Sequence, residues 1–319
     1  MKKIINEEQT DEWGVTYGNY GRVLESVDGN LFTCEEYTIP EGVEVMEYNA
    51  FYGQTNLRRI HLPSTLREMG DNAFIHCSIE SIEFPEGMTE IPGSACEVCK
   101  ELKAVRLPAT IKGIGIGAFN GCDKLEEINL PDSILFMEDN VFSGCASLKH
   151  VTLPEQLSWI APELFDSSGI ESITIPNNIT GIGYWAFWGC DNLKSLTIPE
   201  SVILIGRGIV SAHEGFEGVV CHAPGYHVEN EALIEDKTGT LLCCWTTQKD
   251  YIVPECVNRI AEFSLNDFVE TITVKQYVKI EYHDTFASNH NLKKIDFQGG
   301  VGGKCENIMD NKGIIIKTE

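Results

Sequence analysis

Long apolar runs are absent from this chain of 319 residues. No stretch approaches the roughly 18 consecutive apolar residues that a membrane-spanning helix needs, so we expect no membrane insertion. The chain starts MKKIINEEQTDEWG, where two isoleucines are followed at once by polar residues. A secretory signal needs a longer apolar segment at this point. We therefore expect no signal peptide and, on this ground, a cytoplasmic location.

Basic residues are also scarce, since 24 Lys and Arg stand against 48 Asp and Glu, for a net charge of −24. Such a chain repels a phosphate backbone, and no basic run offsets this locally, so we expect no nucleic-acid partner. The same scarcity excludes a polybasic patch that would hold an anionic membrane surface. The acidic balance favours a basic partner, or it serves only solubility.

Cysteine is too sparse for a small disulfide scaffold, because 12 cysteines are spread over the whole length. Hydrophobic residues make up 43% of the chain and charged residues 23%, as in ordinary globular proteins. The chain is long enough to bury a large core. A disordered chain and a fibre are therefore both excluded.

Proline is present at a regular spacing, because eight of the 12 prolines recur every 22 or 23 residues, as is typical of a solenoid. They are Pro40, Pro63, Pro85, Pro108, Pro131, Pro154, Pro176 and Pro199. The third, sixth and eleventh residues after each proline are apolar, for example Ile111, Ile114 and Phe119 after Pro108. The two repeats that are 22 residues long, Pro63 to Pro85 and Pro154 to Pro176, are both one residue shorter than the others at the same point of the repeat. This shared position supports the alignment of the repeats.

Each repeat ends in alternating polar and apolar residues, as in Leu125–Leu130 before Pro131. This alternation predicts a half-buried strand that proline then ends. The middle of the repeat, GIGAFNGC, is too short and too rich in glycine for a regular helix, and it predicts one helical or 3-10 turn that presents Phe119 inward. The expected fold is a β-rich solenoid of parallel stacked strands with short helical or 3-10 turns.

The recurring pattern IxxIGxxAFxxCxxLxxIxLP resembles the BspA-type leucine-rich repeat, and it extends from Ile39 to Gly206. Members of that family occur widely among bacterial surface proteins and in some parasitic protists. The resemblance implies a leucine-rich-repeat solenoid used for adhesion or protein binding, without catalysis. It also implies the cell surface or secretion as the alternative to a cytoplasmic location.

Four segments are expected along the chain. They are an N-terminal hairpin cap over residues 1–38, the main repeat array over 39–206, a hairpin insertion over 207–253, and degenerate repeats with a cap over 254–319. Asp28-Gly29 is a hairpin turn signal in the first segment. The sequence VENEALIEDKTGTLLCCW indicates strand, turn and strand in the insertion. A last strand is expected at residues 314–316.

Five cysteines share one position, fourteen residues after a proline. They are Cys77, Cys99, Cys122, Cys145 and Cys190. Stacked turns set equivalent side chains in a line, whereas zinc needs four ligands that converge on one point. We therefore interpret these cysteines as small buried residues of the core.

The insertion holds the remaining chemical candidates. Cys221-His222, His227 and Cys243-Cys244 form a group rich in His and Cys that fits no strong zinc spacing, although a hairpin would place Cys243 opposite the segment from Cys221 to His227. The segment Asp236–Thr240 reads DKTGT, the phosphorylated-aspartate motif of P-type ATPases, but we interpret it as a hairpin turn. A metal-binding protein or a hydrolase that uses residues 221–244 is the alternative function.

Two candidate partner surfaces follow from the repeat pattern. Outward strand positions of the N-terminal repeats carry a mixed-charge patch, and the segment GYWAFWGC places three aromatic residues around the inward Phe187. The candidate residues are Arg59, His61, Glu83, Arg106, Tyr184, Trp185 and Trp188. Aromatic clusters are common anchors at interfaces, although a solvated face or packing against the insertion explains the same residues. We predict a monomeric, non-catalytic scaffold for a protein or glycan partner, with no metal and no cofactor.

Overall fold

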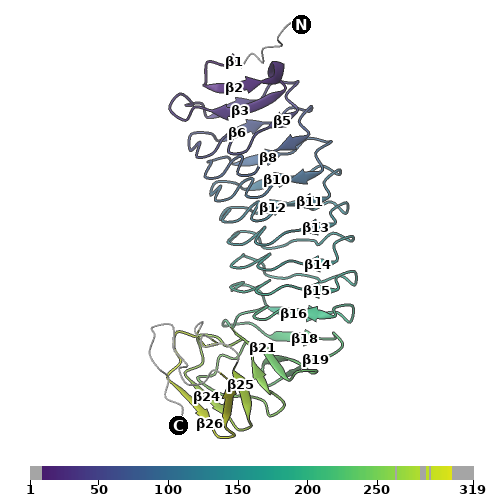
Figure 1. Cartoon of the computed structure of the whole chain (residues 1–319), viewed down its shortest axis with the longest axis vertical. Helices are drawn as coiled ribbons and strands as arrows, with labels where there is room; N and C mark the ends of the chain where they lie inside the picture. The colour runs from purple at the N-terminus through teal and green to yellow at the C-terminus, as the bar shows by residue number, and fades with distance from the viewer. Residues whose placement is uncertain (1–8, 263, 281–284, 287–288, 304–319) are drawn as a thin grey trace. The chain divides into compact units, whose positions relative to one another are not determined.

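The computed structural model describes residues 9–262, 264–280, 285–286 and 289–303. The chain forms two compact units, Met1–Ile170 (unit 1) and Glu171–Glu319 (unit 2). In both units the regular elements are almost all short strands, which turns and irregular segments connect (Figure 1). The strand expected at residues 314–316 lies outside the described residues.

Five windings of unit 1 place a short strand before the proline, at Pro40, Pro63, Pro85, Pro108 and Pro131, as the alternating pattern predicts. These strands pair in parallel in the order β12-β10-β8-β6-β4. They are β4 (Glu36–Thr38), β6 (Arg59–His61), β8 (Ser81–Glu83), β10 (Ala104–Arg106) and β12 (Glu127–Ile128). Equivalent residues of successive repeats lie side by side, so that Ala104 pairs with Ser81 and with Glu127. The central residues Ile60, Ile82 and Val105 are buried.

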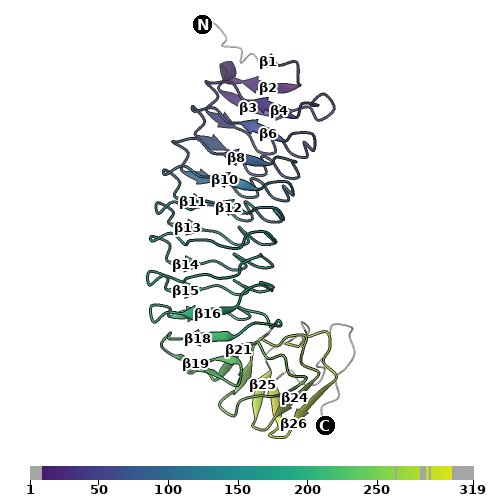
Figure 2. The ribbon, with the colours of Figure 1, turned by 180° about the vertical axis from the view of Figure 1, so that it is seen from behind.

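A second strand follows each proline by five or six residues, and the sequence did not indicate it. Strand β5 pairs in parallel with β7, and β11 pairs in parallel with β9 on one side and with β13 on the other. Strands β11 and β13 follow one another along the stack in Figure 2. These two-residue strands are β5 (Val45–Met46), β7 (Glu68–Met69), β9 (Glu90–Ile91), β11 (Gly113–Ile114), β13 (Phe136–Met137) and β14 (Trp159–Ile160). The two stacks enclose the apolar residues of each winding between them.

Phenylalanines eleven residues after the prolines form the centre of the core of unit 1. Phe51, Phe74, Phe119, Phe142 and Phe165 are fully buried. Rings of adjacent windings stack, with centroids 5.5 Å apart for Phe51 and Phe74 and 5.6 Å apart for Phe142 and Phe165. No winding can bury its own phenylalanine alone, so each depends on its neighbours for stability.

The turns between the two strands of a winding contain 3-10-type hydrogen bonds but no regular helix. The amide of Asn120 donates to the carbonyl of Gly117, and that of Cys122 to Phe119. Left-handed residues interrupt each turn at the ninth and thirteenth positions after the proline, which prevents a longer helix. Among the described residues the one helix is η1 (Asn19–Gly21), a single 3-10 turn.

The N-terminal hairpin is present, but its turn is not at Asp28-Gly29. Strands β1 (Gln9–Thr10), β2 (Val15–Gly18) and β3 (Val23–Val27) pair antiparallel, and Asn19–Gly21 connects the last two. At Asp28 the chain passes to the other sheet, where β4 pairs in parallel with β6. The Asp28 carboxylate accepts a hydrogen bond from the amide of Asn30, so this residue forms a local turn rather than a hairpin.

Unit 2 begins with two parallel strand pairs. They are β15 (Gly181–Ile182) with β17 (Leu204–Ile205), and β16 (Ser195–Ile198) with β18 (Gly218–Cys221). The predicted hairpin follows as an antiparallel meander, which confirms the strand, turn and strand interpretation. Its strands are β19 (Tyr226–Glu229), β20 (Ala232–Glu235) and β21 (Thr240–Cys244).

Parallel pairing resumes after the hairpin. One sheet continues from β21 through β23 (Arg259–Ile260), β25 (Val278–Ile280) and β27 (Val301–Gly303). The other contains β22 (Asp250–Ile252), β24 (Thr271–Val274) and β26 (Lys294–Phe297). Apolar residues of the degenerate repeats are buried, including Val278, Phe286 and Ile295.

Candidate functional site

The four charged candidates of unit 1 lie on one outward sheet face. Arg59 and His61 project from β6, Glu83 from β8 and Arg106 from β10, and all four side chains are exposed. Because successive side chains of a strand alternate in direction, these residues lie opposite the buried Ile60, Ile82 and Val105. Arg106 and Glu83 occupy paired positions of adjacent strands. We call the exposed residues Glu36, Arg59, His61, Glu83 and Arg106 the β4–β10 face.

Glu36 joins this face although the sequence did not single it out. Its carboxylate accepts a hydrogen bond from Arg59 Nε at 2.9 Å, and its other oxygen lies 3.0 Å from His61 Nε2. The hydrogen bonds from His61 and Arg59 lower the pKa of the Glu36 carboxyl. The available signal was its position, 23 residues before Arg59 at the same point of the repeat.

A surface hollow of about 440 Å³ lies along the second strand stack of unit 1. Its lining includes Arg67, Glu68, Gly113, Phe136 and Glu138. Gly113 makes room for the Phe136 ring, since a Cβ at this glycine would lie 2.1 Å from Phe136 Cζ. The repeat pattern of the sequence did not indicate this hollow.

The three aromatic candidates lie in unit 2, between β15 and β16. Tyr184 is exposed, and its ring meets that of Trp185 edge to face with centroids 5.4 Å apart. Trp185 and Trp188 are half-buried. Trp185 has a φ of 55°, a left-handed conformation that is unusual for a bulky residue. The same position holds Asn49, Asn72 or Gly117 in other windings.

The five cysteines that lie fourteen residues after a proline, which we call the cysteine register, are buried in the core, as the sequence indicates. Each described thiol of this set in unit 1 donates to a backbone carbonyl of the preceding winding. The pairs are Cys77 with Phe51, Cys99 with Phe74, Cys122 with Cys96 and Cys145 with Phe119. Burial raises the pKa of the Cys145 thiol to about 12. In unit 2 the Asn266 and Asn289 side chains make equivalent bonds, to the carbonyls of Cys244 and Asn266.

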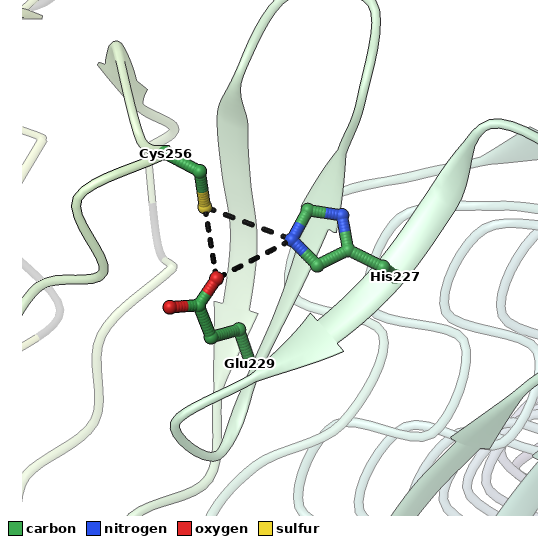
Figure 3. A group of neighbouring side chains, drawn as sticks. All are labelled: His227, Glu229 and Cys256. Atoms are coloured by element: carbon green, nitrogen blue, oxygen red, sulfur yellow. Dashed lines mark hydrogen bonds and ion pairs between the residues drawn. The ribbon is translucent and has the colours of Figure 1, made fainter.

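The meander of unit 2 gathers His227, Glu229, Asp236 and Cys256 on one surface. His227 and Glu229 project from the same side of β19, and Cys256 approaches them from the segment that follows Pro254 (Figure 3). Cys256 Sγ lies 3.6 Å from His227 Nε2 and 3.3 Å from Glu229 Oε2. His227 Nε2 lies 3.7 Å from that same carboxylate oxygen. The Asp236 carboxylate bonds the other ring nitrogen, His227 Nδ1.

This cluster differs from the expected group of Cys221, His222, His227, Cys243 and Cys244. The meander sets Cys243 opposite Leu233 rather than opposite the 221–227 segment, and both Cys243 and Cys244 are buried. Cys221 lies on β18, paired with Ile198. Of the expected group, only His227 therefore lies in the cluster. Sequence spacing could not reveal Cys256, because it lies 29 residues from His227.

The ATPase-like motif lies in the turn that joins β20 and β21, as expected. Asp236 begins this turn, and its amide donates to the carbonyl of Gly225. Gly239 has a φ of 61°, which explains the glycine of the motif by turn geometry. The Thr238 hydroxyl contacts Glu235 and Thr240. The Asp236 carboxylate itself accepts a hydrogen bond from His227 Nδ1.

Two stacks of short parallel strands, with apolar residues at fixed offsets, define a leucine-rich-repeat solenoid. The family comparison agrees: the model of the BspA type leucine rich repeat region matches six copies, over residues 29–142 and 89–216. Together the matches cover more than half of the chain, and the chain belongs to this family.

Solved structures support the same fold. A leucine rich cell surface protein from Faecalibacterium prausnitzii is similar, with a TM-score of 0.56 and 18% identity over 95% of this chain and 94% of that one. A leucine-rich repeat protein from Bacteroides ovatus is similar with a TM-score of 0.57 and 19% identity, over 95% of this chain and 100% of that one. No curated protein is similar enough in sequence to count as a match. Within the described residues, no helix has the length and apolar character needed to cross a bilayer.

Proposed function

We propose that this chain is a non-catalytic scaffold that binds a protein partner through the β4–β10 face of unit 1. The observation that carries the proposal is the exposure of charged side chains at equivalent positions of adjacent parallel strands. A ladder of strands fixes the spacing of Arg59, Glu83 and Arg106, so a partner meets a preorganised surface. Repeat proteins commonly use such extended surfaces for binding.

The charges of this face favour a protein over other partners. Glu36 pairs with both Arg59 and His61, and Arg106 lies beside Glu83, so both signs alternate over a short distance. A mixed pattern matches a partner that carries both signs and rejects a uniform polyanion. No tryptophan or tyrosine is among the outward residues of β6, β8 and β10, so sugar stacking is not supported here.

The test is a double charge reversal, Arg59→Glu with Arg106→Glu, compared with Lys112→Glu and Lys275→Glu. Both pairs change the net charge equally, but Lys112 and Lys275 lie outside the β4–β10 face. A partner captured by the wild-type chain is purified and its affinity measured for each variant. We expect the face variant to bind at least about ten-fold more weakly, with a smaller loss in the control. Equal affinities of the two variants would refute the proposal.

Tyr184, Trp185 and Trp188 are a second candidate surface, and the left-handed Trp185 favours it. Holding tryptophan in this conformation costs about 1–2 kcal/mol, and such a cost is more often found at functional positions. We expect Trp185→Asn to stabilise the fold while weakening partner binding. A variant that gains stability and keeps full affinity would reduce Trp185 to a packing residue.

We further propose an adhesion-type role at the cell surface, supported by the neighbour from F. prausnitzii, which is described as a cell surface protein. Protease treatment of intact cells of the source organism tests this. A surface protein is digested before a cytoplasmic marker is lost, whereas protection until lysis contradicts the location.

The non-catalytic part of the proposal has its own test at Asp236. We expect the purified chain not to hydrolyse ATP or p-nitrophenyl phosphate in the presence of magnesium. Turnover that disappears in Asp236→Asn would instead favour a hydrolase based on residues 221–244.

A further inference from the structure

The cluster on the meander of unit 2 has the donor atoms of a transition-metal site. An imidazole nitrogen, a carboxylate oxygen and a thiol sulfur lie within 4.8 Å of one another, on His227, Glu229 and Cys256. Among the described residues it is the one group of three or more His, Cys, Asp or Glu that meets this condition. Thiolate and imidazole ligands favour zinc and its neighbours over calcium or magnesium, which prefer oxygen ligands.

The separations between the donor atoms match a tetrahedral ion. Zinc bonds of about 2.3 Å to sulfur and about 2.0–2.2 Å to nitrogen and oxygen place tetrahedral ligands about 3.3–3.6 Å apart. The observed separations are 3.6 Å for sulfur to nitrogen, 3.3 Å for sulfur to oxygen and 3.7 Å for nitrogen to oxygen. Each lies close enough that small side-chain rotations would complete the coordination.

A carboxylate already orients the histidine ligand. Asp236 bonds Nδ1 of His227, which fixes the ring so that Nε2 faces Glu229 and Cys256. Metal-binding histidines usually hold their second nitrogen in this way, because the partner sets the tautomer and the ring orientation. Because Nδ1 donates its proton in a hydrogen bond to Asp236, the lone pair lies on Nε2, which can then bind an ion.

The backbone holds these residues in place before any ion binds. Asn230 and Glu231 both have positive φ values, 47° and 56°, and form the tight turn that joins β19 to β20. The Asn230 side chain donates to the carbonyl of Ile252, and the Tyr251 hydroxyl donates to the carbonyl of Asn230. These bonds fasten the tip of the meander to the segment that leads to Cys256.

From this geometry we propose that His227, Glu229 and Cys256 bind one Zn²⁺-like ion, with Asp236 as the residue that positions His227. The Cys256 thiol releases its proton to solvent when its sulfur bonds the ion. Three protein ligands leave a fourth position for water, as in zinc sites that exchange ligands. The site lies outside the β4–β10 face, so a test of metal binding does not depend on whether that face binds a partner.

Cobalt substitution tests the proposal on the full chain under reducing conditions. We expect titration with Co²⁺ to give a thiolate charge-transfer band and the visible bands of a tetrahedral ion, saturating at one ion per chain. Zn²⁺ should displace Co²⁺ and bleach both bands. Absence of the bands in the wild-type chain would overturn the site.

Matched variants locate the ion. Cys256→Ser and His227→Gln should lose the tetrahedral spectrum, while Cys34→Ser and His213→Gln, which change the same residue types elsewhere, should keep it. Asp236→Asn should weaken binding by about 10–100-fold without removing the bands, as loss of a positioning residue does. A spectrum that survives in Cys256→Ser, with circular dichroism showing intact folds, would contradict the proposed ligands.

Discussion

The ninth and thirteenth residues after each proline have positive φ in the windings of unit 1, and some windings have residues there that do not favour this conformation. Thirteen residues after the proline, Gly53, Gly121 and Gly144 adopt positive φ without strain, whereas Val98 is held at 56°. A β-branched residue is strained there. We expect Val98→Gly to raise the free energy of unfolding by about 1 kcal/mol, measured by urea denaturation. Val151→Gly, at a residue without positive φ, should instead lower it.

A single thiol in the cysteine register also has a measurable role. Cys145 is fully buried, and its Sγ donates to the carbonyl of Phe119 at 3.3 Å. Cys145→Ala removes this donor and should lower the free energy of unfolding by about 1 kcal/mol. Cys145→Ser keeps a donor, and Ser168 already occupies the equivalent buried position, so its loss should be smaller. A serine variant less stable than the alanine variant would show that packing rather than hydrogen bonding dominates.

Three parallel strands of unit 2 share one ion network at their starts. Glu270, just before β24, receives Lys249 Nζ at 2.6 Å from before β22, and it also pairs with Lys293 from before β26. The hydrogen bonds from the two lysines lower the pKa of Glu270 from its ordinary value of 4.5 to about 2. A lowered pKa means that this stabilisation is complete above pH 4.5 and is lost as the pH falls towards 2.

Glu270→Gln should therefore be less stable than the wild-type chain at pH 7, and the difference should disappear as the pH approaches 2. Urea denaturation at a series of pH values measures the difference. Glu200→Gln, a change at an exposed residue of unit 2, corrects for general effects of losing a carboxylate. A difference that stays constant down to pH 2 would exclude the network as its source.

The periodic elements of the fold were predictable, because the same pattern of proline and apolar residues recurs in every repeat. The prolines and the apolar third, sixth and eleventh residues fixed the windings and the buried phenylalanines. The second strand of each winding was missed because it is only two residues long and includes Gly113 and Glu90. The turn residues Val98 and Trp185 adopt left-handed conformations that their residue types disfavour, so the surrounding windings determine them.

The candidate sites were predictable only where they repeat. Arg59, Glu83 and Arg106 lie at one period and fall on one face, as the alignment indicated. The cluster of His227, Glu229 and Cys256 depends instead on the meander and on a segment 27 residues beyond Glu229. Contacts of that kind are set by strand pairing within unit 2, and no local pattern in the sequence encodes them.

The charge of the whole chain makes its stability depend on ionic strength. With 48 acidic and 24 basic residues, repulsion among carboxylates exceeds the attraction within the ion pairs, so added salt should screen more repulsion than attraction. We expect the melting temperature to rise between low salt and 0.5 M NaCl at pH 7. KCl should act equally, because screening depends on ionic strength rather than on the cation. A melting temperature that falls with salt would mean that networks such as Lys249–Glu270–Lys293 outweigh the net charge.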